Sequence, residues 1–195
     1  MEFKDSITKD NLMRAFAGES QARNRYTIAA KEANKQGLYI VEGIFTFTAN
    51  QELSHAKVFY NHLRELAGET IHVDGGYPVD LSDSVETLLT MAQHNEYEEH
   101  DVVYKDFAEK AREEGFKRIA SSFQLIAEVE KVHGDRFGKF AELIKNNQLF
   151  VSDCSIQWMC MNCGYIYEGT SAPKKCPVCE YDQGYFMRLE LTPYQ

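Results

Sequence analysis

The chain has 195 residues, 44% of them hydrophobic, so it can bury a sizeable core, which argues against intrinsic disorder. Thirty acidic residues outweigh 21 basic ones, and the net charge of −9 argues against nucleic acid and anionic membrane surfaces as partners. No apolar run approaches the roughly 18 residues that a membrane helix needs. The N-terminal sequence has no basic segment followed by an apolar one, so we expect a cytoplasmic protein without a secretory signal.

The placement of proline and glycine predicts long helices. All four prolines lie at or after position 78, and none falls in 1–77 or 79–172, so these stretches contain no helix breaker. Gly37, Gly68 and Gly115 each follow a strongly helical run, where glycine commonly ends a helix. We therefore predict four helices, at about 8–36, 38–67, 83–114 and 116–146.

One of the connections between these helices is long. Residues 68–82 contain Asp-Gly-Gly-Tyr-Pro, which cannot continue a helix, and Asp83 with Glu86 forms a capping-box pattern at the start of the third helix. The other two connections are tight, so helices one and two, and helices three and four, should form antiparallel hairpins. Two hairpins joined by a long crossover are typical of a ferritin-like four-helix bundle. The predicted fold is therefore mainly α.

The character of the sequence changes after residue 146. The remaining segment holds all five cysteines, three of the four prolines and the only tryptophan, together with short stretches that favour β-strands. So short a segment builds little core of its own and needs a metal to hold it together. We therefore predict a helical bundle over 1–146, followed by a linker and a small metal-stapled β/loop domain over 147–195.

Acidic residues and histidines interrupt the apolar stripes that should face the bundle core. These interruptions are Glu19 in the first helix, Glu52 and His55 in the second, Glu96 and Glu99 in the third, and Glu130 and His133 in the fourth. On the third helix, the apolar stripe itself is expected to consist of Leu88, Ala92, Val103 and Phe107.

Five carboxylates near the middle of a bundle need compensating charge. A buried, unpaired carboxylate is strongly destabilising, and basic residues are not interleaved on the stripes in matching number. Two divalent cations would nearly balance the five carboxylates, and oxygen and imidazole donors suit iron or manganese. A single Glu-x-x-His pair, such as Glu69 and His72 in the long connection, is common and uninformative. Two such pairs on core-facing stripes indicate a dinuclear carboxylate site.

The cysteines form a second candidate site. Two Cys-x-x-Cys pairs, Cys160–Cys163 and Cys176–Cys179, are separated by twelve residues. Such pairs bring four thiolates together tetrahedrally, which suits either zinc or a single iron, and the spacing alone does not choose between them. Gly164 allows the backbone to turn so that N–H groups can point at sulfur. Cys154 lies outside the pairs, and we expect it to be a packing residue.

Three parts of the sequence resemble the rubrerythrin family: AFAGESQARNRY near the N-terminus, the two Glu-x-x-His helices, and the tail with WMCMNCGYIYEG and CPVC. The resemblance covers essentially the whole chain. It implies a ferritin-like di-iron bundle with a C-terminal rubredoxin-like Fe(Cys)4 domain, which favours iron over zinc in the tail. One departure is Glu180, where many rubredoxin-like second knuckles have glycine; it should affect hydrogen bonding to sulfur but not the ligand set.

The resemblance also implies a role for each candidate ligand. The bridging residues would be Glu52 and Glu130, and the terminal ones Glu19 and Glu99 on one iron and Glu96 and His133 on the other. His55 would replace Glu99 when the site is reduced, which makes these two the residues expected to take part in the reaction. Tyr26 and Tyr104 would hydrogen-bond ligand carboxylates and fix their orientation.

The implied activity is the reduction of hydrogen peroxide to water in oxidative-stress defence. A reduced iron pair holds the two electrons required, and the Fe(Cys)4 site would restore them one at a time. Electrons would come from an NADH-dependent reductase, directly or through rubredoxin, because the chain has no G-x-G-x-x-G motif for a nicotinamide cofactor. Two alternatives stay open: a ferritin-like protein that oxidises or stores iron, and a zinc-stabilised interaction domain on a metal-binding bundle.

The length of the fourth helix bears on the assembly. From Glu130 to Asn146 it would span about 24 Å, which places the cysteine domain of the same chain far from the dinuclear site. We therefore expect a head-to-tail homodimer in which each tail docks beside the partner's bundle. A tail that folds back on its own bundle is the alternative.

Overall fold

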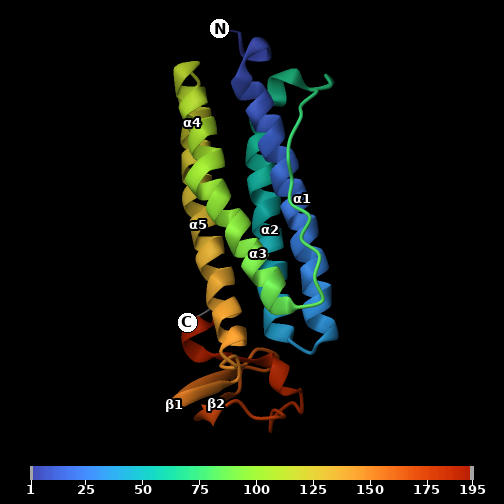
Figure 1. Cartoon of the computed structure of the whole chain (residues 1–195), viewed down its shortest axis with the longest axis vertical. Coiled ribbons are helices and arrows are strands. Elements are labelled where there is room, and N and C mark those ends of the chain that lie inside the picture. Colours follow the sequence, from blue (N-terminus) through green and yellow to red (C-terminus); the bar gives the residue numbers. More distant parts are fainter. Residues whose placement is uncertain (1, 194–195) are drawn as a thin grey trace.

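The computed structural model describes residues 2–193, with a helical bundle and a small β module at one end of it (Figure 1). The bundle consists of α1 (Ile7–Lys35), α2 (Tyr39–His62), α3 (Val85–Glu98), the π-turn η3 (Glu99–Val103), α4 (Tyr104–Glu113) and α5 (Lys117–Lys145). α1 packs on α2, and α3 and α4 pack on α5. The crossover from α2 to α3 runs along α1 (Figure 1), so the fold is the predicted ferritin-like bundle.

The third predicted helix is interrupted by the π-turn. A π-turn holds one more residue than an α-turn, so the buried stripe moves by one position beyond it. Tyr104 and Ala108 are buried, whereas Val103 and Phe107, which the sequence periodicity placed on the stripe, are only partly buried. The prediction of an unbroken helical period through residue 114 is therefore wrong at this point. The shift turns the Tyr104 side chain into the bundle.

The helix ends agree with the glycine pattern, with one correction at a start. Gly37, Gly68 and Gly115 have φ angles of 69°, 95° and 91°, the left-handed conformation that ends helices. At the start of α3, however, Ser84 Oγ accepts a hydrogen bond from the Thr87 N–H at 3.2 Å. Ser84 rather than Asp83 therefore caps this helix, because the helix begins one residue later than the capping-box pattern predicted.

Two aromatic clusters enclose the middle of the bundle. One contains Phe59, Tyr104 and Phe123, and the other contains Tyr26, Phe45 and Phe137. Glu52 lies seven residues from both Phe45 and Phe59 on α2, which is about two helical turns on either side. Glu130 has the same spacing from Phe123 and Phe137 on α5. The acidic middle of the bundle is therefore closed off by apolar layers above and below.

The C-terminal module is a three-stranded antiparallel sheet in the order β2-β1-β3, formed by β1 (Val151–Cys160), β2 (Ile166–Ser171) and β3 (Phe186–Arg188). It packs against the end of the bundle, where the rings of Tyr39 and Tyr185 stack with their centroids 4.2 Å apart. Arg188 donates hydrogen bonds to the carbonyl oxygens of Gln148 and Val151 at 3.0 and 2.8 Å. The division into domains at residue 146 stays a prediction. Within residues 2–193, none of the helices combines the length and apolarity that a membrane span requires.

The module approaches the bundle closely at Gly184. A Cβ atom at this position would lie 1.8 Å from the Gly37 carbonyl oxygen. We expect Gly184→Ala to destabilise this docking by about 1–3 kcal/mol and to expose residues 146–150 to limited proteolysis. Gly43→Ala is the control, since a Cβ there meets nothing within 4 Å. Equal protease sensitivity of the two variants would contradict the docking described here.

Glu114, at the end of α4, caps the first turn of α1. Its carboxylate accepts hydrogen bonds from the N–H groups of Ile7 and Thr8 at 3.0 and 2.8 Å, and from the Thr8 hydroxyl at 2.6 Å. Burial raises the pKa of Glu114, but these hydrogen bonds outweigh it and lower the pKa overall. A carboxyl group with a lowered pKa stabilises the fold above its unfolded pKa of about 4.3, and this stabilisation is lost as pH falls through the folded pKa.

Glu114→Gln should therefore lower the free energy of unfolding at neutral pH by about 1 kcal/mol. Its difference from the wild type should shrink as the pH falls below about 4, because the wild-type carboxyl group is then protonated as well. Urea unfolding over a pH series measures this difference. A difference that stays constant with pH would show that the carboxylate charge does not matter.

Candidate metal centres

Two overlapping sets of donor groups meet in the middle of the bundle. One set is Glu19, Glu52, His55 and Glu130, and the other is Glu52, Glu96, Glu130 and His133. Within each set, the donor atoms all lie within 4.8 Å of one another. Glu52 and Glu130 belong to both sets, so their carboxylates lie between two neighbouring positions. The structure therefore brings together six of the seven bundle residues that the sequence pattern singled out.

Glu99 is the seventh, and among the described residues it belongs to neither set. It is the first residue of the π-turn and is half-buried. His55, which is expected to exchange with Glu99, lies in the first set: its Nδ1 atom is 2.9 Å from Glu130 Oε1 and 3.7 Å from Glu19 Oε2. In this arrangement, His55 rather than Glu99 therefore belongs to the donor set that contains Glu19.

The converging donor atoms are buried but not hydrogen-bonded. Within residues 2–193, the atoms without a hydrogen-bond partner include Glu19 Oε2, Glu96 Oε2, both carboxylate oxygens of Glu52 and Glu130, and both ring nitrogens of His133. His133 Nδ1 lies 2.8 Å from Glu130 Oε2 and 3.0 Å from Glu52 Oε1, but these contacts do not have hydrogen-bond geometry. Buried polar atoms without a partner are strongly unfavourable. Lone pairs that converge in this way fit a pair of metal ions.

The electrostatics of the site also favour bound cations. Burial, reinforced by the Glu52 carboxylate, raises the pKa of Glu96 to about 8. Burial likewise raises the pKa of Glu19, with Glu130 adding to it, and the pKa of Glu99, with Glu96 adding to it. Among the described residues, the ion-pair partners of the converging carboxylates, Glu19, Glu52, Glu96 and Glu130, are histidines rather than lysines or arginines. Two divalent ions would supply the missing positive charge.

Two tyrosines hold the carboxylates of Glu19 and Glu96. The Tyr26 hydroxyl donates a hydrogen bond to Glu96 Oε1, and the Tyr104 hydroxyl donates one to Glu19 Oε1. Both tyrosines are buried. Each bond occupies one oxygen and leaves the other, Oε2, without a hydrogen-bond partner in the described part of the chain. These are the hydrogen bonds expected of the two tyrosines, and they orient the carboxylates toward the centre.

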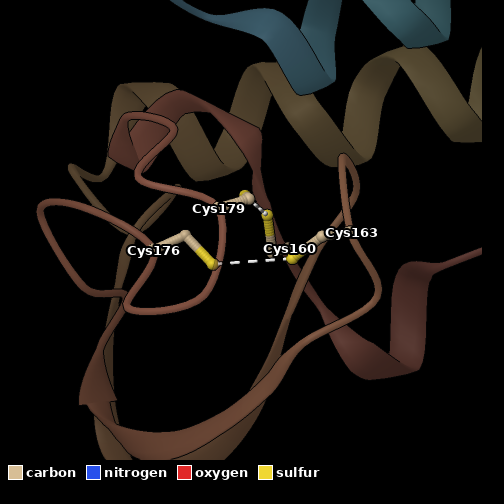
Figure 2. A group of neighbouring side chains, drawn as sticks. All are labelled: Cys160, Cys163, Cys176 and Cys179. Atoms are coloured by element: carbon tan, nitrogen blue, oxygen red, sulfur yellow. Dashed lines mark hydrogen bonds between the residues drawn. The ribbon is translucent and has the colours of Figure 1, made fainter.

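The four paired cysteines converge in the C-terminal module (Figure 2). Cys160 Sγ lies 3.7 Å from Cys179 Sγ, and Cys163 Sγ lies 3.6 Å from Cys176 Sγ. These distances exceed the roughly 2.04 Å of a disulfide and match the separation of about 3.75 Å between thiolates bound tetrahedrally at about 2.3 Å to one ion. The residues therefore fit a single iron.

The two knuckles have the same backbone turn. The Gly164 N–H donates to the Cys160 carbonyl at 2.8 Å, and the Glu180 N–H donates to the Cys176 carbonyl at 2.9 Å. The φ angles of Gly164 and Glu180 are 78° and 62°. Glu180 therefore adopts the left-handed conformation that glycine takes without strain, at a cost of about 1 kcal/mol. The ligand set is the same as with glycine.

Backbone N–H groups and burial act differently on the sulfur atoms. The Tyr181 N–H lowers the pKa of the Cys179 thiol to about 6. Burial raises the pKa of the Cys160 thiol to about 12, against the effect of the Asn162 N–H. Both cysteines would bind a metal as thiolates, since an ion deprotonates its thiol ligands.

Cys154 differs from its prediction. Its side chain is exposed, so it is not a packing residue. The strand register is irregular between Val151 and Ile156, which breaks the alternation that would turn a side chain at this position inward.

The fold, the donor sets in the bundle and the four cysteines together define a di-iron carboxylate protein with a rubredoxin-like single-iron module. The family model described as "Rubrerythrin" matches residues 10–141, and the one described as "Rubrerythrin, rubredoxin-like domain" matches residues 158–187. The chain belongs to the rubrerythrin family of di-iron oxidative-stress proteins. Its cofactors are a pair of irons in the bundle and one iron at the four cysteines.

Individual relatives cover nearly the whole chain. Rubrerythrin-1 of Clostridium acetobutylicum is 45% identical, and the rubrerythrin of Clostridium perfringens 43% identical, each with 94% of both chains covered. Among solved structures, a mixed-valent state of nigerythrin has 29% identity and a TM-score of 0.63, with 94% of this chain and 90% of that chain covered. A Desulfovibrio desulfuricans bacterioferritin, 22% identical with a TM-score of 0.64 over 72% of this chain and 81% of its own, shares the fold alone.

Proposed function

We propose that this chain is a cytoplasmic peroxidase that reduces hydrogen peroxide to water with electrons relayed through its rubredoxin-like site. The proposal rests on the presence, in one chain, of the dinuclear donor set and the four-cysteine site. When bound, the reduced iron pair supplies the two electrons that peroxide cleavage requires, and the single iron supplies the one-electron steps that restore them. A protein that only oxidised or stored iron would not need a dedicated electron inlet, which favours the peroxidase.

We propose a ligand assignment that follows the two donor sets. Glu52 and Glu130, which belong to both sets, would be shared by the two irons. Glu96 and His133 would complete one position, and Glu19 would be a ligand at the other. His55 and Glu99 would alternate at the position of Glu19, with His55 as the ligand in the reduced protein. The position of His55 within the first set, and of Glu99 outside it, is the arrangement that the reduced form would have.

The residues around the ligands hold them in place and keep water out. Tyr26 and Tyr104 each fix one carboxylate by a hydrogen bond, so the ligands are oriented before a metal binds. The side chains of Glu19, Glu52, Glu96 and Glu130 are at most 1% exposed. Bulk water therefore does not compete for these positions.

The exchange of His55 and Glu99 gives a specific expectation for His55→Ala. This variant should still bind the iron pair in the oxidised protein, because the other ligands remain, but its turnover with peroxide should fall by about 10–100-fold. Iron analysis and steady-state kinetics measure the two effects. His62→Ala is the control: His62 lies two turns further along α2 and contacts Ser122 rather than the site. Crystal structures of both redox states with the same iron–His55 distance would contradict the exchange.

We further propose that an NADH-dependent reductase supplies the electrons, directly or through rubredoxin. We also propose that the chain forms a head-to-tail homodimer. The observation that supports the dimer is the distance between the dinuclear site and the cysteine module of one chain. α5 continues for fifteen residues from Glu130 to Lys145, about 22 Å, before the module begins (Figure 1). A neighbouring subunit would offer the module a dinuclear site closer than its own.

Peroxidase activity and iron storage are separated by two measurements on the iron-loaded protein. With a reductase and NADH, the proposal predicts NADH oxidation that depends on hydrogen peroxide. With excess ferrous iron and oxygen, it predicts that binding saturates at about three irons per chain. Uptake of a mineral of many irons, without peroxide-dependent NADH oxidation, would establish storage instead. One zinc per chain in a colourless module would establish the structural-zinc alternative.

A further inference from the structure

A cavity of about 200 Å³ lies between α1, the crossover and η3, outside the two donor sets. Its outer side is formed by the crossover, including Gly75, Gly76 and Tyr77, and its inner side includes Glu99 and Tyr104. Tyr104 donates its hydrogen bond to Glu19, a member of the first donor set. The cavity therefore lies between the crossover and Glu99, one of the two residues proposed to alternate at the dinuclear site.

The crossover is fastened over this cavity at two points. The Arg14 guanidinium donates to the Asp74 carboxylate and carbonyl at 2.9 and 3.1 Å, and the Tyr77 hydroxyl donates to the Arg14 carbonyl at 3.2 Å. Further along the crossover, Asp80 accepts hydrogen bonds from Arg25 of α1 and from Asn95 of α3. The outer wall of the cavity is therefore held against both hairpins.

Two glycines lie close to the Tyr77 ring at the outer side of the cavity. A Cβ at Gly75 would lie 2.9 Å from the Tyr77 hydroxyl oxygen, so a side chain there would displace the end of the ring. A Cβ at Gly18, which is buried in α1, would lie 3.8 Å from Tyr77 Cε1. The gap between Gly18 and Tyr77 is therefore narrow, and a larger side chain at residue 18 would fill it.

The size of the cavity suits a very small molecule. Pockets for drug-sized ligands measure about 300–1,000 Å³, and a water molecule takes about 30 Å³ of liquid volume. The cavity therefore holds hydrogen peroxide with a few waters, whereas an aromatic hydroperoxide would fill nearly all of it and would have to pass the residues at its outer side.

We propose that this cavity is the access chamber for peroxide, and that Tyr77 of the crossover acts with Gly18 as a size filter that admits hydrogen peroxide and excludes bulky organic hydroperoxides. The inference rests on the proposed peroxidase function. Under this proposal, Tyr77 and Gly18 determine which peroxides reach the site and take no part in the chemical reaction.

Kinetics with two substrates test the filter. Tyr77→Ala should raise kcat/KM for cumene hydroperoxide relative to hydrogen peroxide by about tenfold, whereas Tyr77→Phe, which keeps the ring and loses the hydrogen bond to Arg14, should keep the wild-type ratio. Gly18→Leu should lower kcat/KM for both peroxides at unchanged iron content. Gly43→Leu, an exposed helical glycine elsewhere, is its matched control. An unchanged ratio in Tyr77→Ala would overturn the filter, whereas a wild type inactive with every peroxide would overturn the proposed function.

Thiol labelling of the iron-loaded protein tests access without using activity. In a Cys154→Ser background, Gly18→Cys places a thiol at the narrow point, and peptide mass spectrometry follows its reaction with methyl and benzyl methanethiosulfonate. We expect the methyl reagent to react about tenfold faster, and Tyr77→Ala to remove the difference. Gly43→Cys should react readily with both reagents. Equal rates at residue 18 with Tyr77 present, or no reaction with either reagent, would overturn the proposal even if Gly18→Leu failed to fold.

Discussion

Glu130→Ala should reduce the iron content from about three atoms per chain to about one and abolish peroxide reduction. Glu130 belongs to both donor sets, so its loss removes a ligand from each position at once. The four-cysteine site is built from a separate segment, and its visible absorption should stay at the wild-type level. Full occupancy of the iron pair in this variant, with wild-type peroxidase activity, would reject the bridging assignment.

The stabilisation that added iron gives should also depend on the Glu130 charge. In the metal-free protein this charge has two opposed effects. It repels the neighbouring buried carboxylates, and, against the effect of burial, it raises the pKa of His55 and His133, whose Nδ1 atoms lie 2.9 and 2.8 Å from its oxygens. Glu130→Gln keeps the shape of the side chain and removes both effects, so we expect the free energy of unfolding of metal-free protein to change little. The stabilisation by added iron should fall by about 1–3 kcal/mol, because a charged ligand is lost from both positions. Glu128→Gln, an exposed position on the same helix, is the matched control and should leave this stabilisation unchanged.

Cys176→Ser should disconnect the electron supply without damaging the dinuclear site. Cys176 is a buried member of the cysteine set, so the module should lose its iron and its local fold. Peroxide reduction driven by a reductase should fall by about 100-fold or more, whereas chemically reduced protein should still react once with peroxide at the wild-type rate. Cys154→Ser, a cysteine outside the set, should behave as wild type. Unimpaired reductase-driven turnover in Cys176→Ser would show that electrons bypass the module.

Mixing two inactive variants tests where the electrons cross. A Cys176→Ser chain keeps the dinuclear site, and a chain with Glu52→Ala and Glu130→Ala keeps the cysteine site. If electrons pass between subunits of the proposed dimer, verified heterodimers should regain reductase-driven activity. Heterodimers without activity would favour a path within one chain.

The bundle, the crossover and six of the converging donors could be predicted from the sequence because each depends on a local, periodic signal. Helical periodicity predicts which side chains face the core along the whole length of a helix, and the Glu-x-x-His pairs lie at such positions. The period also explains the error in burial beyond α3. A π-turn leaves no signature in hydrophobic spacing, so a continuous period places Val103 and Phe107 inside, where the structure has Tyr104 and Ala108.

Other features depend on contacts that spacing does not encode. His55 and Glu99 both lie at core-facing positions, and only the packing of the bundle decides which of them joins the donor set of Glu19. The exposure of Cys154 follows from a register irregularity in β1. The cavity under the crossover arises from residues in three separate segments, which are brought together by the Arg14–Asp74 and Arg25–Asp80 contacts.

The most direct test of the coupled two-site peroxidase is anaerobic stopped-flow mixing of the fully reduced protein with two equivalents of hydrogen peroxide per chain, and in parallel with dioxygen. Two equivalents are needed because the three irons of a chain hold three electrons and one equivalent removes only two. The visible absorption of the oxidised four-cysteine site reports whether its electron has been used. The account predicts rapid reoxidation by peroxide, return of this absorption after the dinuclear site has reacted, and a slower reaction with dioxygen. A four-cysteine site that stays reduced after peroxide has been consumed, or a faster reaction with dioxygen, would contradict it.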